Sequence, residues 1–194
     1  MLPTRTPLTD AGRPASIVRR GLAYAADTIL LGVVYLLLTE TLDAMFGPLA
    51  VVSPEGDRLI STEVQPLRVA LTLAAILVID AAYFAGSWAL AGGTPFQLLA
   101  RLSVRPVDAP PGPAGVVSRL EAGNALRRWA VMALLPLCAG LLGSSGAVPL
   151  EPVATFDAAW TLGLLVTVVL DRRRRGLHDR LAGSLVVEAR AGRP

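Results

Sequence analysis

Residues 19–39 read RRGLAYAADTILLGVVYLLLT, and this stretch decides the class of fold. From Gly21 to Thr39 it is mostly apolar and contains a single charged residue, Asp27. A bilayer hydrocarbon core of about 30 Å needs about 20 helical residues, so the stretch predicts a membrane-spanning helix. It is longer than the core of a secretory signal and precedes no clear cleavage site, so we interpret it as a retained anchor.

Three further apolar stretches indicate that the whole chain is built around the membrane. Hydrophobic residues make up 53% of the 194 residues and charged residues 17%, which is too little charge for the surface of an ordinary soluble domain. The last two stretches are short, so they are either re-entrant pieces or spans completed by flanking residues; the arginine distribution favours spans. The predicted spans are residues 21–39, 67–90, 127–143 and 153–170.

The distribution of arginine predicts the orientation. All 18 basic residues are arginines; four precede the first stretch, five lie between the second and third, and seven follow the fourth, whereas Arg58 and Arg68 alone fall in the other two segments. Because cytoplasmic loops carry the excess of positive charge, we expect both termini and the middle loop to be cytoplasmic. The predicted fold is therefore an all-α membrane protein, a four-helix transmembrane bundle with N-in/C-in topology.

The segments outside the spans suggest one membrane domain and no separate soluble domain. Residues 1–16 are predicted to form a flexible cytoplasmic arm, residues 17–187 the transmembrane domain, and residues 188–194 a short tail. In the middle loop, residues 96–105 could lie along the membrane surface. The single cysteine and single histidine exclude a cysteine-based metal cluster, and no P-loop, metalloprotease or lipase pattern occurs. We therefore expect no catalysis, no metal, no cofactor and no nucleic-acid partner.

Asp27 is the first residue that could carry chemistry. An aspartate inside a span costs about 2.5–3.5 kcal/mol on insertion scales, so it must face the bundle interior or a wet cavity. Arg20, nearly two turns earlier, and Tyr24, one turn earlier, lie on the same helix face. Asp27 either joins helices through hydrogen bonds or binds an ion or proton.

Asp80 lies near the middle of the second predicted span, and Tyr83 follows at i+3. Antiparallel neighbouring helices could bring Asp80 close to Asp27, and two carboxylates in low dielectric would share a proton or a cation. Alternatively, each acid is protonated or hydrogen-bonded separately, to Tyr24 or Tyr83. The candidate ion- or proton-binding residues are Asp27, Asp80, Arg20 and Tyr24.

A cluster of charge follows the last span. Four consecutive arginines, Arg172, Arg173, Arg174 and Arg175, act as an orientation signal and can bind anionic lipid headgroups. The lone histidine, His178, has either a structural role or a pH-sensing role. Asp179 either caps the following turn or pairs with Arg20 across the cytoplasmic interface.

Three blocks of sequence resemble the RDD family of bacterial membrane proteins. The first is RGLAYAAD at 20–27, the second is GGTP at 92–95 with ALRR at 125–128, and the third is RGLHDRLAG at 175–183. Family members commonly read Gly-x-Thr-Pro-Gly-Lys, whereas Phe96 and Gln97 stand here in place of Gly-Lys. The family-motif residues are Arg20, Asp27, Thr94, Pro95, Arg128, His178 and Asp179.

The resemblance implies a multi-pass protein of the bacterial inner membrane. It also implies transport, with sodium–proton or proton antiport suggested for some members. Asp27 and Asp80 favour a small cation, proton or solute transporter. The small number of spans and the absence of a repeat favour the alternative, a non-catalytic accessory or assembly subunit of a larger membrane complex. The expected partners are the lipid bilayer, with its anionic headgroups, and a homo-oligomer or larger membrane complex.

Overall fold

Helices dominate the computed structural model, which describes residues 14–48, 50–54, 60–109, 119–144 and 149–188. Within these ranges, three helices are long and apolar enough to cross a membrane: Ile17–Phe46, Pro66–Leu90 and Glu151–Leu170. The predicted arm as far as residue 13, the Pro-rich turn of the middle loop from residue 110, and the tail from residue 189 lie outside the described residues.

Helix α1 spans Ile17–Phe46 and is longer at both ends than the predicted span 21–39. Its 30 residues measure about 45 Å at 1.5 Å per residue. The buried residues, Ala23, Asp27 and Leu31, recur every four positions and form one narrow stripe. The rest of the helix surface is largely apolar, as expected for a helix that faces lipid on most sides.

The second apolar stretch forms one continuous helical run with a wider turn inside it. Helix α2 (Pro66–Ala81) passes into a π-helical segment η2 (Ala82–Gly86) and then into α3 (Ser87–Leu90). These bounds agree with the predicted span 67–90. π-Segments often occur at functional sites. This one carries Tyr83, whose hydroxyl donates a hydrogen bond to Asp27, as described below.

The third apolar stretch is also interrupted by a π-helical segment. Helix α5 (Ala122–Trp129) continues through η3 (Ala130–Leu134) into α6 (Leu135–Ser144), where one span, 127–143, was predicted. Pro136 has no N–H to donate to the carbonyl four residues earlier, which accounts for an irregular turn just before it. Helix α7 (Leu150–Leu170) packs along α6 and includes the fourth predicted span.

Two small antiparallel sheets were not anticipated by the prediction of an all-helical chain. Strands β1 (Ala50–Pro54) and β2 (Ile60–Val64) form a hairpin between α1 and α2. Strand β3 (Leu102–Pro106) pairs with β4 (Ser184–Glu188). The segment 96–105 forms a short helix α4 (Pro95–Leu99) followed by β3, and its position on the membrane surface stays a prediction.

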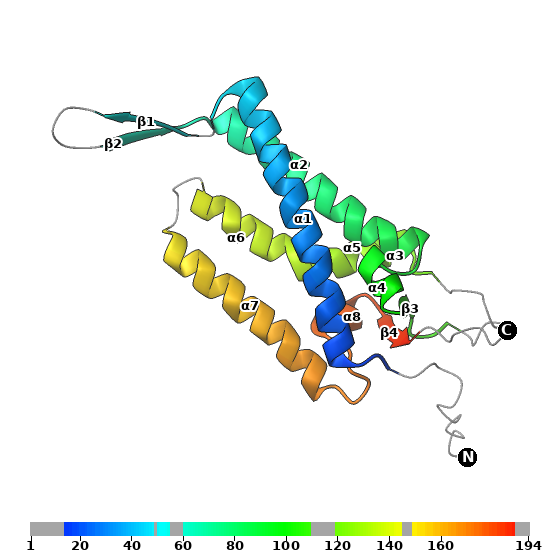
Figure 1. Cartoon of the computed structure of the whole chain (residues 1–194). Coiled ribbons are helices and arrows are strands. Elements are labelled where there is room, and N and C mark those ends of the chain that lie inside the picture. The colour runs from blue at the N-terminus through cyan, green and yellow to red at the C-terminus, as the bar shows by residue number, and fades with distance from the viewer. Residues whose placement is uncertain (1–13, 49, 55–59, 110–118, 145–148, 189–194) are drawn as a thin grey trace, which may run out of the picture.

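Short elements from the middle of the chain, α4 and β3, and from its last part gather with the start of α1 at one end of the long helices. Figure 1 shows the start of α1, α4, α8 (Leu177–Leu181) and the β3–β4 sheet together, with the β1–β2 hairpin at the opposite end. A bridge between Pro14 and Val187 joins the segment before α1 to β4. The apolar core also extends toward this end and includes Ala15, Trp88, Leu102, Val104, Ala125 and Val186.

Candidate functional site

Asp179, at the start of α8, joins three helices through ion pairs. It is fully buried, and its Oδ2 accepts a hydrogen bond from Nη2 of Arg20 at 2.5 Å. Its Oδ1 accepts from Nε of Arg128 at 3.0 Å and lies 2.8 Å from Nη2 of the same residue. Arg20 lies in the first turns of α1 and Arg128 near the end of α5. The carboxylate therefore fixes α8 against both helices.

Two neutral donors also contact the buried carboxylate of Asp179. The backbone N–H of Gly176 donates to Oδ2 at 3.2 Å, and the hydroxyl of Ser184 donates to Oδ1 at 3.3 Å. Burial alone would raise the pKa of Asp179, but the guanidinium groups of Arg128 and Arg20 outweigh it and hold that pKa below its usual range. Asp179 is therefore a permanent anion, suited to holding the two arginines in place.

His178 is buried beside this pair and stays neutral. Its Nε2 lies 3.6 Å from Oδ1 of Asp179, too far for a hydrogen bond. Burial, as the largest cause, lowers the pKa of His178 to about 4. Charging the ring at neutral pH is thus disfavoured, which supports the structural role over the pH-sensing role considered from sequence.

Asp27 accepts two short hydrogen bonds from hydroxyl groups. Tyr83 in η2 donates to Oδ1 at 2.5 Å, and Thr94 donates to Oδ2 at 2.5 Å. Asp27 and Thr94 are both fully buried. Of the two tyrosines considered from sequence, Tyr83 is the donor, whereas the Tyr24 side chain is 42% exposed and its ring contacts Phe84. Asp27 therefore joins α1 to the second helix and to the turn before α4.

The departure from the usual family sequence after Thr94 has a structural role here. The Oγ1 of Thr94 accepts from the N–H of Gln97, and the Oε1 of Gln97 accepts from the N–H of Thr94, so the two residues form a capping box at the start of α4. Gln97 Oε1 also accepts from Nε1 of Trp88 at 3.0 Å. Gln97 thus stabilises the turn that presents the Thr94 hydroxyl to Asp27.

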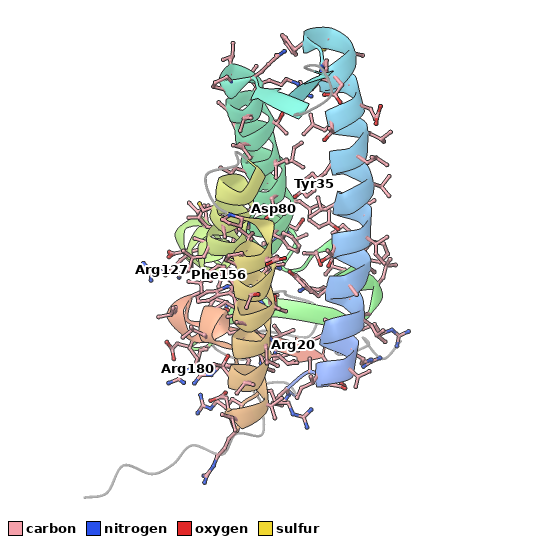
Figure 2. The ribbon with its side chains drawn as sticks, turned by 90° about the vertical axis from the view of Figure 1, so that its left-hand side faces the viewer. Arg20, Tyr35, Asp80, Arg127, Phe156 and Arg180 are labelled. Carbon is pink, nitrogen blue, oxygen red and sulfur yellow. The ribbon has the colours of Figure 1, made fainter. Side chains whose placement is uncertain are left out.

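Asp80 is held by a different pair of donors. Tyr35 on α1 donates to Oδ1 at 2.6 Å, and Nε1 of Trp129 donates to Oδ2 at 2.6 Å. Figure 2 shows Tyr35 and Asp80 beside each other between α1 and the second helix, away from Arg20. In the described part of the chain no hydrogen bond or ion pair joins Asp80 to Asp27. The two acids therefore stand in separate hydrogen-bonded sites rather than sharing donors.

A cavity of about 490 Å³ lies between α1, α7 and the two interrupted helical runs, α2–η2–α3 and α5–η3–α6. Asp80 lines this cavity and Asp27 does not. The cationic side chains Arg20 and Arg128 line the cavity close to each other, because both pair with Asp179, and His178 lies beside them. The other polar lining residues are Tyr24, Thr28, Tyr35, Gln97, Asp157 and Thr161.

The arginine run after α7 divides into exposed and half-buried members. Arg172, Arg173 and Arg174 are exposed, as a headgroup-binding segment requires, whereas Arg175 is half-buried. The Oδ2 of Asp171 accepts from the backbone N–H groups of Arg173 at 3.1 Å and Arg175 at 2.9 Å. These hydrogen bonds, led by that from Arg175, lower the pKa of Asp171.

Two further sets of contacts, those of Arg68 and those of Asp80, correspond to no sequence motif. Arg68, assigned from sequence to an outer loop, is buried near the start of α2, and its Nη2 lies 2.6 Å from Oδ1 of Asp43. The position of Arg68, a charged residue at the margin of a predicted span, was the one feature of the sequence that could have indicated this contact. Tyr35 and Trp129 gave no signal, because their spacing from Asp80 in sequence is unrelated to their contact. Among the described residues no group of three or more His, Cys, Asp or Glu side chains could hold a metal ion.

The fold and the buried charges define a helical membrane protein in which one arginine-bound aspartate joins the first helix to the segment after the last. The family model described as the RDD family matches residues 14–183. The chain therefore belongs to the RDD family, as its three sequence blocks predicted. Comparisons with curated proteins and with solved structures gave no match.

Proposed function

We propose that the chain is a four-span protein of the bacterial cytoplasmic membrane, with both ends inside, that exchanges a proton or small cation during transport. The arginine distribution supports this topology. It is further supported by the arrangement of the small elements, since the start of α1 and strand β4 lie at the same end of the helices. In this proposal the run α5–η3–α6 forms the fourth span, in addition to the three helices that are long and apolar enough by themselves.

The observation that carries the functional proposal is the position of Asp80 on the cavity. Its two donors, Tyr35 and Trp129, are neutral, so neither supplies a counter-charge to the carboxyl group. Asp179, in contrast, has two arginine partners. An isolated carboxylate in a low-dielectric setting gains from binding a proton or a small cation. Asp27 also has only neutral donors, but Asp80 lines the cavity and Asp27 does not. Asp80 is therefore the better exchange group, and Asp27 is a joint between helices.

Purified protein in vesicles tests this proposal with a pH-sensitive dye and imposed sodium, potassium or lithium gradients. Wild-type protein should move protons in response to at least one gradient. Asp80→Asn keeps the shape but removes the titratable charge, so it should abolish the flux. Asp27→Asn should retain most of it, because that side chain does not line the cavity.

Two outcomes would contradict the proposal. If Asp27→Asn lost the flux and Asp80→Asn kept it, the exchange would be assigned to Asp27 and not to Asp80. A folded wild-type protein that moves no protons with any of the three cations, across a range of pH, would favour the accessory or assembly subunit instead.

A further inference from the structure

We propose that the arginine end of the cavity binds the anionic headgroup of a membrane phospholipid, with part of an acyl chain in the apolar space between α1 and α7. This site shares its cavity with Asp80 but is held by other residues, Arg20 and Arg128. It does not depend on the exchange proposed at Asp80, because a bound lipid requires no flux.

The charges around Asp179 are unbalanced in favour of an anion. Arg20 and Arg128 contribute two positive charges and Asp179 one negative charge, while His178 is neutral. The Arg128 side chain is only 3% exposed, and its Nη1 is buried without a hydrogen-bond partner. The guanidinium also stacks over Trp88 at 4.1 Å, so the ring holds it in place. A buried donor of this kind favours an anionic oxygen as its acceptor.

The shape of the cavity favours a ligand with an apolar part. Gly21, Thr28 and Gly32 of α1 line the cavity and are nevertheless exposed, as are Thr161 and Leu165 of α7. The cavity therefore opens between two helices that are long and apolar enough to span a membrane. With α1 and α7 as spans, as proposed above, an opening at that position faces the hydrocarbon phase, from which a lipid can enter and a free inorganic anion cannot.

The dimensions agree with a partly inserted lipid. Arg20 and Tyr35 both line the cavity and lie 15 positions apart on α1, or about 22 Å. One leaflet of a hydrocarbon core of about 30 Å is shorter than this, so the cavity is deep enough for a chain. A volume of about 490 Å³ accommodates a headgroup and part of one chain, with the remainder of the lipid in the open mouth.

Native mass spectrometry of the full chain in an uncharged detergent tests the site. Phosphatidylglycerol and phosphatidylcholine with identical chains are compared at high salt, which screens the exposed arginines Arg172–Arg174. Wild-type protein should retain one phosphatidylglycerol in preference to phosphatidylcholine. Arg128→Gln should weaken that retention by about tenfold or more, as expected for loss of a charge-assisted hydrogen bond. Arg127→Gln is the matched control, because Arg127 is exposed on the same helix and does not line the cavity.

A second variant keeps the test valid if Arg128→Gln fails to fold. A Cβ added at Gly32 meets no atom within 4 Å, so Gly32→Leu should fill the cavity without disturbing the ion pairs. It should abolish retention, whereas Gly163→Leu, equally open but outside the cavity, should not. Equal retention of the two lipids, retention in Gly32→Leu, or displacement of the lipid by inorganic phosphate would each overturn the phospholipid assignment.

Discussion

The guanidinium of Arg20 donates from Nη2 to Oδ2 of Asp179 at 2.5 Å, although 159 positions separate the two residues in the chain. The contact confirms the pairing predicted from their positions at the two ends of the apolar region. Arg20 Nη1 also donates to the backbone carbonyl of Arg174. Together with Arg128, the pair fixes the start of α1, the α5 helix and α8 as one unit.

Asp179→Asn should be strongly destabilising. The substitution leaves Arg20 and Arg128 largely buried without their counter-charge, and breaking a buried ion pair on one side costs about 3–5 kcal/mol. We expect little folded protein on size-exclusion chromatography and a large fall in the thermal midpoint. Asp171→Asn is the control, because Asp171 forms an ion pair with the half-buried Arg175 and should change the midpoint little. The asparagine oxygen can still accept the backbone hydrogen bonds from residues 173 and 175. Equal midpoints for wild type and Asp179→Asn would contradict the role assigned to this carboxylate.

His178 should make the stability of the protein depend on pH between about 6.5 and 4. Its pKa is about 4 in the folded protein and 6.5 when exposed, so the unfolded chain binds the extra proton in this range. Stability should therefore be constant above pH 6.5 and fall as the pH decreases, by about 2 kcal/mol at pH 5. The chain has a single histidine, so thermal unfolding of His178→Gln in the same detergent should be nearly flat from pH 7 to 5. If wild type and His178→Gln lost stability equally as the pH falls, the pH dependence would come from groups other than His178.

The parts of the fold that follow from local sequence were predictable, and those that depend on distant contacts were not. Apolar runs located α1, the second helix and α7, because span length is a property of consecutive residues. The β3–β4 sheet pairs Val104 with Val186, and neither strand shows its partner in its own sequence. The donors of Asp80 were missed for the same reason. The two π-segments also depend on packing that no local pattern specifies.

Gly176 should be intolerant of a side chain. A Cβ at this position would lie 2.6 Å from Cε1 of His178 and 2.9 Å from Cγ2 of Val168. Overpacking of a buried site costs about 1–3 kcal/mol, so Gly176→Ala should lower the thermal midpoint clearly. Gly140→Ala is the matched control, since a Cβ there meets nothing within 4 Å. If His178→Ala restores the midpoint of Gly176→Ala, the clash with the ring is the cause; a Gly176→Ala midpoint equal to wild type would refute it.

The last prediction concerns the orientation of the chain in the membrane. Sixteen arginines lie in the segments assigned to the cytoplasm, so the end of the helices that carries α8 and the β3–β4 sheet should face inward. The opposite end, where α1 continues past the predicted span to Phe46, should face outward. A periplasm-active phosphatase fused after Pro194 should therefore show no activity in cells.

Labelling of single cysteines distinguishes this topology from its inverse more sharply than a fusion does. The chain has one cysteine, so Cys138→Ser gives a cysteine-free background. Glu40 and Arg180 are both exposed and lie toward opposite ends of the molecule, beside the hairpin end of α1 and in α8 respectively. In intact cells with a permeable outer membrane, an impermeant maleimide should label Glu40→Cys and leave Arg180→Cys unreacted until the inner membrane is disrupted. Labelling of Arg180→Cys but not of Glu40→Cys in intact cells would indicate the inverse topology. Labelling of both positions in intact cells would place the two ends on the same side, which no arrangement with α1 as a complete span allows.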